Sequence, residues 1–200
     1  MVAIILAAGA SERMGVPKAL LEIGSRTFIR HLVDVYRAAG VEKIVVVLRP
    51  DAAVIENELA GLDVTFVLNR HPEKGQLSSI VAGLEAARTF GPEGALIHPV
   101  DHPSVSTATI NKLLEQYNQR RGLIVLPTCK GRRGHPVLFS SKLFDELMNA
   151  RPDVGARSVV WAHRKDVTEV ETAEEGVIRD IDTPHDYEHL QRHLSSSRRE

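Results

Sequence analysis

The chain has 200 residues and a formal net charge of −1, so its surface as a whole is not a nucleic-acid footprint. Aromatic residues make up 4% of the sequence, which argues against single-strand binding by base stacking. A single cysteine cannot form an internal disulfide, and no apolar run approaches the roughly 20 residues of a membrane helix. We expect a cytoplasmic protein without membrane or nucleic-acid partners, folded as one domain over residues 1–200 with a frayed end at 195–200.

Strands and helices are predicted to alternate along the chain. Short apolar runs favour strands at 2–6, 43–48, 64–68, 95–98 and 123–126, with shorter strands at 136–139 and 167–171. Apolar residues at helical spacing favour helices at 27–39, 52–59, 78–88, 107–119, 142–149, 155–163 and 184–194. This alternation indicates βαβ units and an α/β fold, a three-layer α/β/α sandwich with a mostly parallel sheet.

A loop of small residues, LAAGASERMG, follows the first predicted strand. Ligands of open α/β sheets bind at the carboxyl ends of the strands, and small residues let backbone N–H groups approach phosphate oxygens. Arg13 and Lys18 add positive charge to this loop. The spacing of Gly9 and Gly15 fits neither the dinucleotide-binding fingerprint nor the P-loop. Because Pro17 disfavours a helical residue before it, the loop does not run directly into a helix.

The pattern L-A-A-G-x-S-x-R-M-G-x-x-K, from Leu6 to Lys18, resembles the signature of the MobA-like nucleotidyltransferases. NRHPEKGQLSSI (69–80) and VDHP (100–103) are similar to further segments of that family, although Gln76, Leu77 and His102 depart from its pattern. GRRGHPVLF (131–139), DVGAR (153–157) and DIDTPHDY (180–187) resemble the branch that transfers CMP to molybdopterin, the molybdenum cofactor cytidylyltransferases. The resemblance implies a Rossmann-like nucleotidyltransferase fold similar to that of the glycosyltransferase-A enzymes.

The resemblance also implies a reaction and a set of site residues. The enzyme would transfer a nucleotide, CMP in this branch, from a nucleoside triphosphate to a phosphate-bearing acceptor, with Mg²⁺ or Mn²⁺ as cofactor. Arg13, Lys18 and Asp101 would be catalytic, and Asp101 and Asp182 would hold the metal. The binding residues would be Leu6, Ala7, Ala8, Gly9, Ser11, Arg13, Lys18, Asn69, Gly75, Ser78 and His135. Ala8 stands where the guanylyl-transferring branch tends to have a second glycine.

Several of these residues have an alternative, purely structural interpretation. Asp101 is also a typical turn residue, and Asp180, Asp182 and Thr183 are each suitable N-caps, so either Asp180 or Asp182 is the second metal ligand. Ser78 is equally suited to cap a helix. Two other functions stay open: a sugar-1-phosphate nucleotidyltransferase, and an accessory protein that binds the molybdenum cofactor with little turnover. A molybdoenzyme that receives the product is an expected partner.

Overall fold

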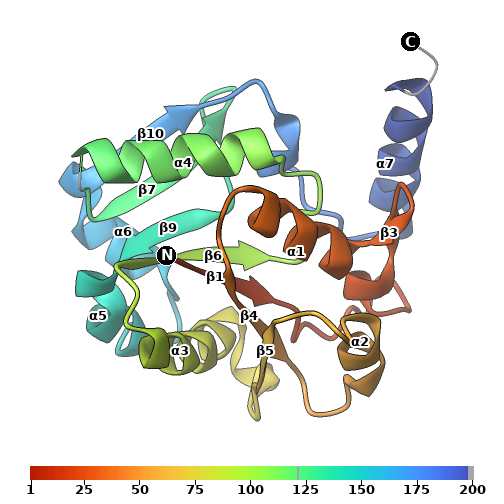
Figure 1. The fold of residues 1–200 in the computed structure, drawn as a ribbon, viewed down its shortest axis with the longest axis horizontal. Helices are drawn as coiled ribbons and strands as arrows, with labels where there is room; N and C mark the ends of the chain where they lie inside the picture. The colour runs from red at the N-terminus through yellow and green to blue at the C-terminus, as the bar shows by residue number, and fades with distance from the viewer. Residues whose placement is uncertain (121, 198–200) are drawn as a thin grey trace.

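The structure, a computed structural model, describes residues 1–120 and 122–197 and confirms the α/β fold (Figure 1). The main sheet has the strand order β10-β7-β9-β6-β1-β4-β5, and β8 pairs with β7. All of its pairings are parallel except those of β8 and β9. The strands are β1 (Val2–Leu6), β4 (Lys43–Leu48), β5 (Thr65–Leu68), β6 (Gly94–Pro99), β7 (Ile124–Cys129), β8 (Arg132–Arg133), β9 (Val137–Ser140) and β10 (Val167–Glu171).

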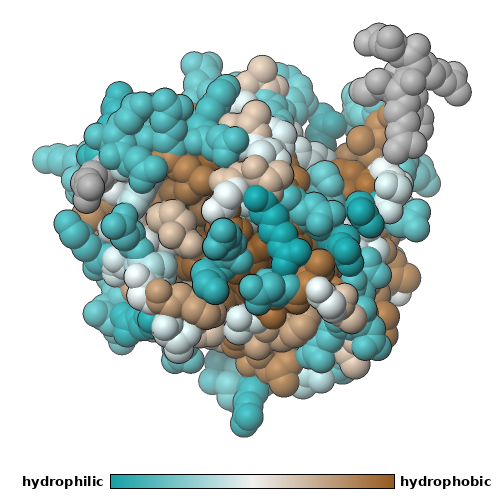
Figure 2. All heavy atoms as spheres, in the orientation of Figure 1, coloured by the Kyte–Doolittle hydropathy of each residue, from teal (hydrophilic) through white to brown (hydrophobic). Residues whose placement is uncertain are grey.

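Helices cover both faces of this sheet. On one face lie α1 (Phe28–Ala38) and α4 (Thr107–Arg120), and on the other lie α3 (Gln76–Ala87), α5 (Phe144–Met148) and α6 (Arg157–Ala162). Two further helices, α2 (Ala53–Glu58) and α7 (Pro184–Ser197), lie at the end of the sheet where β1 and β6 point in Figure 1. On the face drawn in Figure 2, most of the outer surface of α4 is hydrophilic. Among the described residues, no helix combines the length and apolar character of a membrane span.

The central strand β1 shows why its sequence is apolar throughout. Its side chains alternate between the two faces: Ala3 and Ile5 join the core beneath α1 and α4, whereas Val2, Ile4 and Leu6 join the core beneath α3. A strand with parallel neighbours on both sides and helices on both faces has no solvent-facing side, so it needs no polar positions.

Each predicted strand and helix is present, with shifted ends and some additions. The predicted strand at 123–126 extends to Cys129, and the predicted helix at 142–149 begins as a 3₁₀ turn at Ser141–Leu143. A small hairpin, β2 (Glu22–Ile23) with β3 (Arg26–Thr27), was not predicted because two-residue strands show no periodicity. The frayed end expected from 195 is helical up to Ser197, and residues 198–200 lie outside the described residues.

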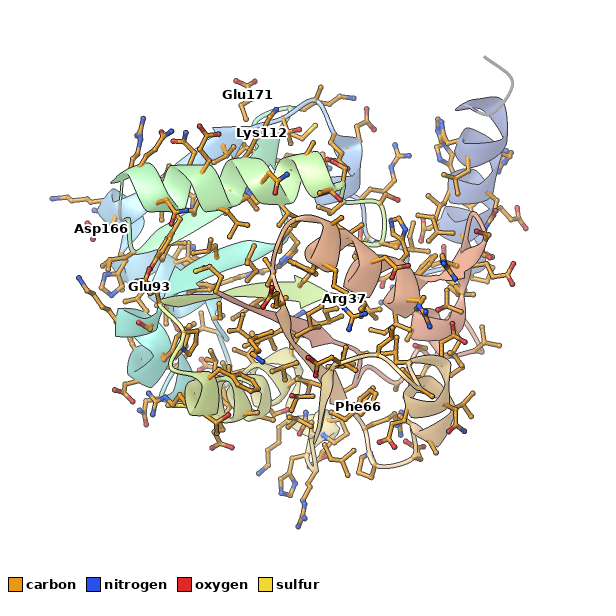
Figure 3. The ribbon with its side chains drawn as sticks, viewed as in Figure 1. Arg37, Phe66, Glu93, Lys112, Asp166 and Glu171 are labelled. Carbon is orange, nitrogen blue, oxygen red and sulfur yellow. The ribbon has the colours of Figure 1, made fainter. Side chains whose placement is uncertain are left out.

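The topology defines a crevice at the carboxyl edge of the sheet. The chain passes from β1 outward to β4 and β5, and then returns to form β6 on the opposite side of β1. The loops after β1 and β6 therefore diverge, as they do at the ligand-binding switch point of open α/β sheets. Glu93 and Asp166, which precede β6 and β10, mark the opposite edge in Figure 3.

Candidate active site

The loop after β1 folds around Ser11. The Ser11 Oγ accepts a hydrogen bond from the Lys18 N–H at 3.1 Å, and the Ser11 carbonyl accepts from the N–H groups of Met14 and Gly15 at 3.0 and 3.1 Å. Ser11 and Gly15 both have positive φ, 54° and 74°. Within the described part of the chain, the backbone N–H groups of residues 8–13 donate no hydrogen bond, so they are available to an anionic ligand.

Lys18 and Arg13 meet two carboxylates in front of this loop. The Lys18 Nζ lies 3.5 Å from Asp101 Oδ2 and donates a hydrogen bond to Asp182 Oδ1, while the Arg13 guanidinium lies 2.7 Å from Asp182 Oδ2. The hydrogen bond from Lys18, with a smaller contribution from Arg13, lowers the pKa of the Asp182 carboxyl. The structure thus brings four of the predicted site residues together from the loop after β1, the loop after β6 and the segment before α7.

Backbone contacts position the two carboxylates. The N–H of Ile181 donates to the Asp101 carbonyl at 2.8 Å, which fixes the segment before α7 against the loop after β6. Within this segment Ile181 is buried, Asp180 is exposed and Asp182 contacts Lys18. Thr183 and Asp186 form the capping interactions of α7, and Asp182 is therefore not needed as the cap.

The carboxylates have the donor chemistry of a divalent-metal site. Asp101 Oδ1 is buried and has no hydrogen-bond partner among the described residues, and a metal ion would satisfy it. Mg²⁺ typically takes one or two protein carboxylates and completes its shell with phosphate oxygens and water. Asp101 and Asp182 fit this requirement. No group of three or more His, Cys, Asp or Glu suited to a metal occurs in the described residues, so these two carboxylates would depend on substrate oxygens.

A cavity of about 740 Å³ opens over the loop and the carboxylates. Of the predicted residues, those that line it are Leu6, Ala7, Ala8, Gly9, Ser11, Arg13, Lys18, Gly75, Asp101 and Asp182. Sequence reasoning missed the segment after β4, where Arg49 and Asp51 form an ion pair at 2.5 Å and also line the cavity. This RPD segment directly follows a buried parallel strand, and such a strand ends at the carboxyl edge of the sheet, where ligands bind. Its position in the sequence could therefore have indicated that it lies at the site.

Asn69 and Ser78 do not line this cavity but hold the loop before α3. The buried Asn69 amide donates to Ser78 Oγ at 2.8 Å and to Ser79 Oγ at 2.9 Å, and its carbonyl oxygen accepts from the His71 N–H at 2.9 Å. These contacts present Gly75, whose φ of 85° favours glycine, and the start of α3 to the cavity. Asn69 and Ser78 thus fix the position of this loop.

His135 lies in a second cavity, of about 610 Å³, which shares Gly75, Gln76 and Pro99 with the first. Burial, aided by the neighbouring His102 and Arg157, lowers the pKa of His135 to about 3. Packing requires a glycine before His135. A Cβ on residue 134 would lie 2.3 Å from the Val177 carbonyl oxygen, which accepts a hydrogen bond from the His135 N–H.

Comparisons with known proteins place this geometry in a family. The MobA-like NTP transferase domain matches residues 3–167. A probable molybdenum cofactor guanylyltransferase of Bacillus mycoides (strain KBAB4) is 35% identical over 130 residues, 65% of this chain and 62% of that protein. The purine catabolism protein PucB of Bacillus subtilis (strain 168) is 26% identical over 203 aligned positions, 98% of each chain. The chain thus spans less than two thirds of the first relative.

Solved structures share the whole fold. Rv0371c of Mycobacterium tuberculosis H37Rv is 28% identical, with a TM-score of 0.79 over 96% of this chain and 98% of that chain. A complex of Rv0371C with manganese matches with a TM-score of 0.72 and 26% identity, over 96% of this chain and 97% of that chain. The family match includes the loop after β1 and Asp101, and it ends before Asp182. This chain belongs to the family of MobA-like NTP transferase domains.

Proposed function

We propose that the protein transfers CMP from CTP to the phosphate of molybdopterin or its molybdenum-loaded form, and releases pyrophosphate. The observation that carries nucleotidyl transfer is the convergence of Arg13, Lys18, Asp101 and Asp182 in one cavity, beside a loop of unpaired backbone N–H groups. Such an arrangement supplies the donors and the carboxylates that a triphosphate and its metal require. A molybdoenzyme would receive the product.

The proposed step needs position and charge rather than a covalent enzyme intermediate. A phosphate oxygen of the acceptor attacks the α-phosphorus of the triphosphate, a new P–O bond forms, and the bond to the β-phosphate oxygen breaks. Lys18 and Arg13 neutralise the charge that develops on the departing pyrophosphate. Asp101 and Asp182 would hold Mg²⁺, or Mn²⁺ in its place, which when bound screens the phosphate charges.

The base preference rests on the resemblance of residues 131–139 and 180–187 to the cytidylyl branch and on Ala8. Ala8 is buried and lines the cavity, so its methyl group affects how closely a base and ribose can approach the backbone. A contact of this size is worth about 1–3 kcal/mol, which predicts a measurable but incomplete preference for CTP. Transfer of GMP is the second candidate, because the B. mycoides relative is named as a guanylyltransferase.

The test measures pyrophosphate release with CTP, GTP, UTP and dTTP, each offered with molybdopterin or with glucose 1-phosphate. We expect CTP with molybdopterin to react fastest, and Ala8→Gly to narrow the CTP-to-GTP ratio by about tenfold. A preference for GTP in the unmodified protein contradicts the cytidylyl assignment but keeps nucleotidyl transfer. Turnover of UTP or dTTP with the sugar phosphate favours a sugar nucleotidyltransferase, and tight binding of product without release of pyrophosphate favours an accessory protein.

A further inference from the structure

A fully buried histidine lies near the end of β6, directly before the turn that carries Asp101. His98 is paired in register with Ile5 of β1, and its ring packs edge-on against Tyr36 of α1, with ring centroids 5.7 Å apart. Burying a polar ring costs free energy unless its nitrogens are hydrogen-bonded. The core at this point would accept an apolar side chain without that cost, so the contacts of the two nitrogens give the histidine its role.

The two ring nitrogens of His98 form a directed chain of hydrogen bonds. The Nε2 atom lies 3.0 Å from the His102 carbonyl oxygen, which needs a donor, and the Nδ1 atom lies 2.8 Å from the Tyr36 hydroxyl. Nε2 therefore donates and Nδ1 accepts from the hydroxyl. The chain begins on a fully buried tyrosine in the middle of α1 and ends on the backbone one residue after Asp101.

Hydrogen bonds from outside the turn hold its backbone on both sides of Asp101. The peptide group between Asp101 and His102 is fixed at its carbonyl by the Ile181 N–H at 2.8 Å and at its N–H by the Pro99 carbonyl at 3.2 Å. The next carbonyl, that of His102, is the one that His98 holds. Because the backbone dihedral angles determine the direction of each Cα–Cβ bond, these contacts also aim the Asp101 carboxylate.

The turn needs this support because it contains two buried polar atoms without partners. Within residues 1–120 and 122–197, Asp101 Oδ1 and His102 Nδ1 form no hydrogen bond. Unpaired buried polar groups cost free energy, which a mobile turn would recover by moving these atoms toward water or toward Lys18, whose Nζ lies 3.5 Å from Asp101 Oδ2. The hydrogen bond from His98 opposes this relaxation, so Oδ1 stays available to a metal ion.

We propose that His98 is a positioning residue of the candidate metal site: its hydrogen bond to the His102 carbonyl holds the Asp101 turn in the conformation that binds the metal ion. The Tyr36 hydroxyl fixes the tautomer and orientation of the ring that makes this bond. His98 acts through Asp101, so its loss lowers the affinity for metal more than the affinity for nucleotide. This inference rests on the proposed function, since it takes Asp101 as a ligand of the metal that serves nucleotidyl transfer.

The probe is Mn²⁺ alone, because the electron paramagnetic resonance of the free ion measures binding without turnover. We expect His98→Asn to raise the dissociation constant of Mn²⁺ about tenfold or more, as the loss of a group that orients a metal ligand commonly does. His98→Gln should restore most of the affinity, because its amide nitrogen reaches the position of Nε2, whereas that of asparagine is one methylene too short. Tyr36→Phe keeps the bond to the turn but loses the group that fixes the tautomer, and should raise the constant about threefold.

Leu96→Val is the matched control for a loosened core. Leu96 is fully buried, lies on the same strand and face two residues earlier, and is not part of the turn. This variant should lower the stability to urea and leave the dissociation constant of Mn²⁺ unchanged. A loss of affinity that follows the loss of urea stability in Leu96→Val and His98→Asn alike overturns the positioning role.

The remaining variants decide the proposal in other ways. Equal dissociation constants in the unmodified protein, His98→Asn and His98→Gln overturn it, and a loss that His98→Gln does not recover overturns the assignment to Nε2. If His98→Asn does not fold, Tyr36→Phe decides, because an unchanged constant in that variant overturns the chain of hydrogen bonds.

Pyrophosphate release at varied Mg²⁺ keeps this inference apart from the proposed function. We expect His98→Asn to raise the Mg²⁺ concentration for half-maximal rate about tenfold and to leave the KM for CTP at saturating Mg²⁺ within about twofold. A raised KM for CTP with an unchanged Mg²⁺ requirement overturns the inference and leaves nucleotidyl transfer intact. Mn²⁺ binding that depends on His98, in a protein that releases no pyrophosphate, overturns nucleotidyl transfer while the positioning role stands. A protein that neither binds Mn²⁺ nor releases pyrophosphate overturns both.

Discussion

The two cavities at the carboxyl edge of the sheet are built in different ways. The first depends on charge: two cations and two carboxylates meet in it, and the Asp101 and Asp182 side chains are 28% and 25% exposed. The second combines an apolar inner wall and a neutral histidine with charged side chains that do not meet in one cluster, namely Lys74, Arg133, Asp153 and Arg157. Ion pairs between partly exposed groups are cheap to rearrange when a charged ligand arrives, whereas a packed apolar wall keeps its shape. The charged cluster of the first cavity can thus rearrange around a charged ligand, whereas the inner wall of the second cavity is fixed by packing.

Replacing Lys18 with alanine should have the largest effect. Loss of one preorganised charge at the triphosphate should lower the rate of pyrophosphate release about 10²-fold or more at saturating nucleotide and metal. Because Lys18 contacts both Asp101 and Asp182, its removal should also strengthen binding of Mn²⁺ alone, measured by calorimetry. Lys165→Ala, on the exposed surface, is the control. A rate within twofold of the unmodified protein would exclude Lys18 from the triphosphate site.

The parts of the fold that could be predicted are those whose sequence pattern lies within one short segment. The buried parallel strands and amphipathic helices were found because each signal lies within one segment, as in the apolar run of β4. The position of β9, antiparallel between β6 and β7, was not found because it depends on pairings such as Leu96 with Leu138 that are distant in sequence. The apolar pattern of a segment indicates that it forms a strand, but not which strands it pairs with.

The same distinction applies to the candidate site. The spacing from Leu6 to Lys18 located the loop after β1, since all of its groups lie within one short segment. What distinguishes Asp182 from Asp180 is its contact with Lys18 and Arg13, which lie far from it in the sequence. One local signal was nevertheless present. The sequence TPHD (183–186) has the form of a capping box, so Asp182 is not required as the helix cap. The second cavity is lined by residues of two segments that the resemblance singled out, 131–139 and 153–157. That they form one cavity was not predicted, because α6 and the loop before β9 meet only in the folded chain.

A comparison of Asp182→Asn with Asp180→Asn tests which of the two carboxylates of this segment holds the metal ion in the first cavity. The Asp182 variant removes a charge that Lys18 and Arg13 contact, and we expect about a tenfold higher Mg²⁺ concentration for half-maximal rate if it is a metal ligand. Asp180 is exposed, so its variant should titrate like the unmodified protein. Identical metal titrations of all three proteins would show that Asp182 only positions Lys18, and a shift confined to Asp180→Asn would reverse the assignment.

The smallest effect is expected from the buried histidines, which should alter the free energy of unfolding at low pH. His98 is fully buried in β6, where its Nε2 lies 3.0 Å from the His102 carbonyl oxygen and its Nδ1 lies 2.8 Å from the Tyr36 hydroxyl. A carbonyl oxygen only accepts, so Nε2 carries the proton and Nδ1 accepts from the Tyr36 hydroxyl. Burial lowers the pKa of His98 to about 3, as it does for His135, so the folded protein keeps both rings neutral.

The sign of the resulting pH dependence follows from proton linkage. An unfolded histidine binds a proton below pH ~6.5, whereas His98 and His135 in the folded protein stay neutral down to about pH 3, so acid favours the unfolded chain. The free energy of unfolding should therefore be unaffected by these rings above pH ~7 and fall below pH ~6.5, by up to ~1.4 kcal/mol per pH unit for each. Urea unfolding between pH 5.0 and 6.5 measures this slope where free carboxyl groups are still ionised. His98→Gln should remove one histidine's share of the slope and His185→Gln, on the exposed surface, should not, whereas equal slopes in all three proteins would show that His98 takes up its proton without unfolding.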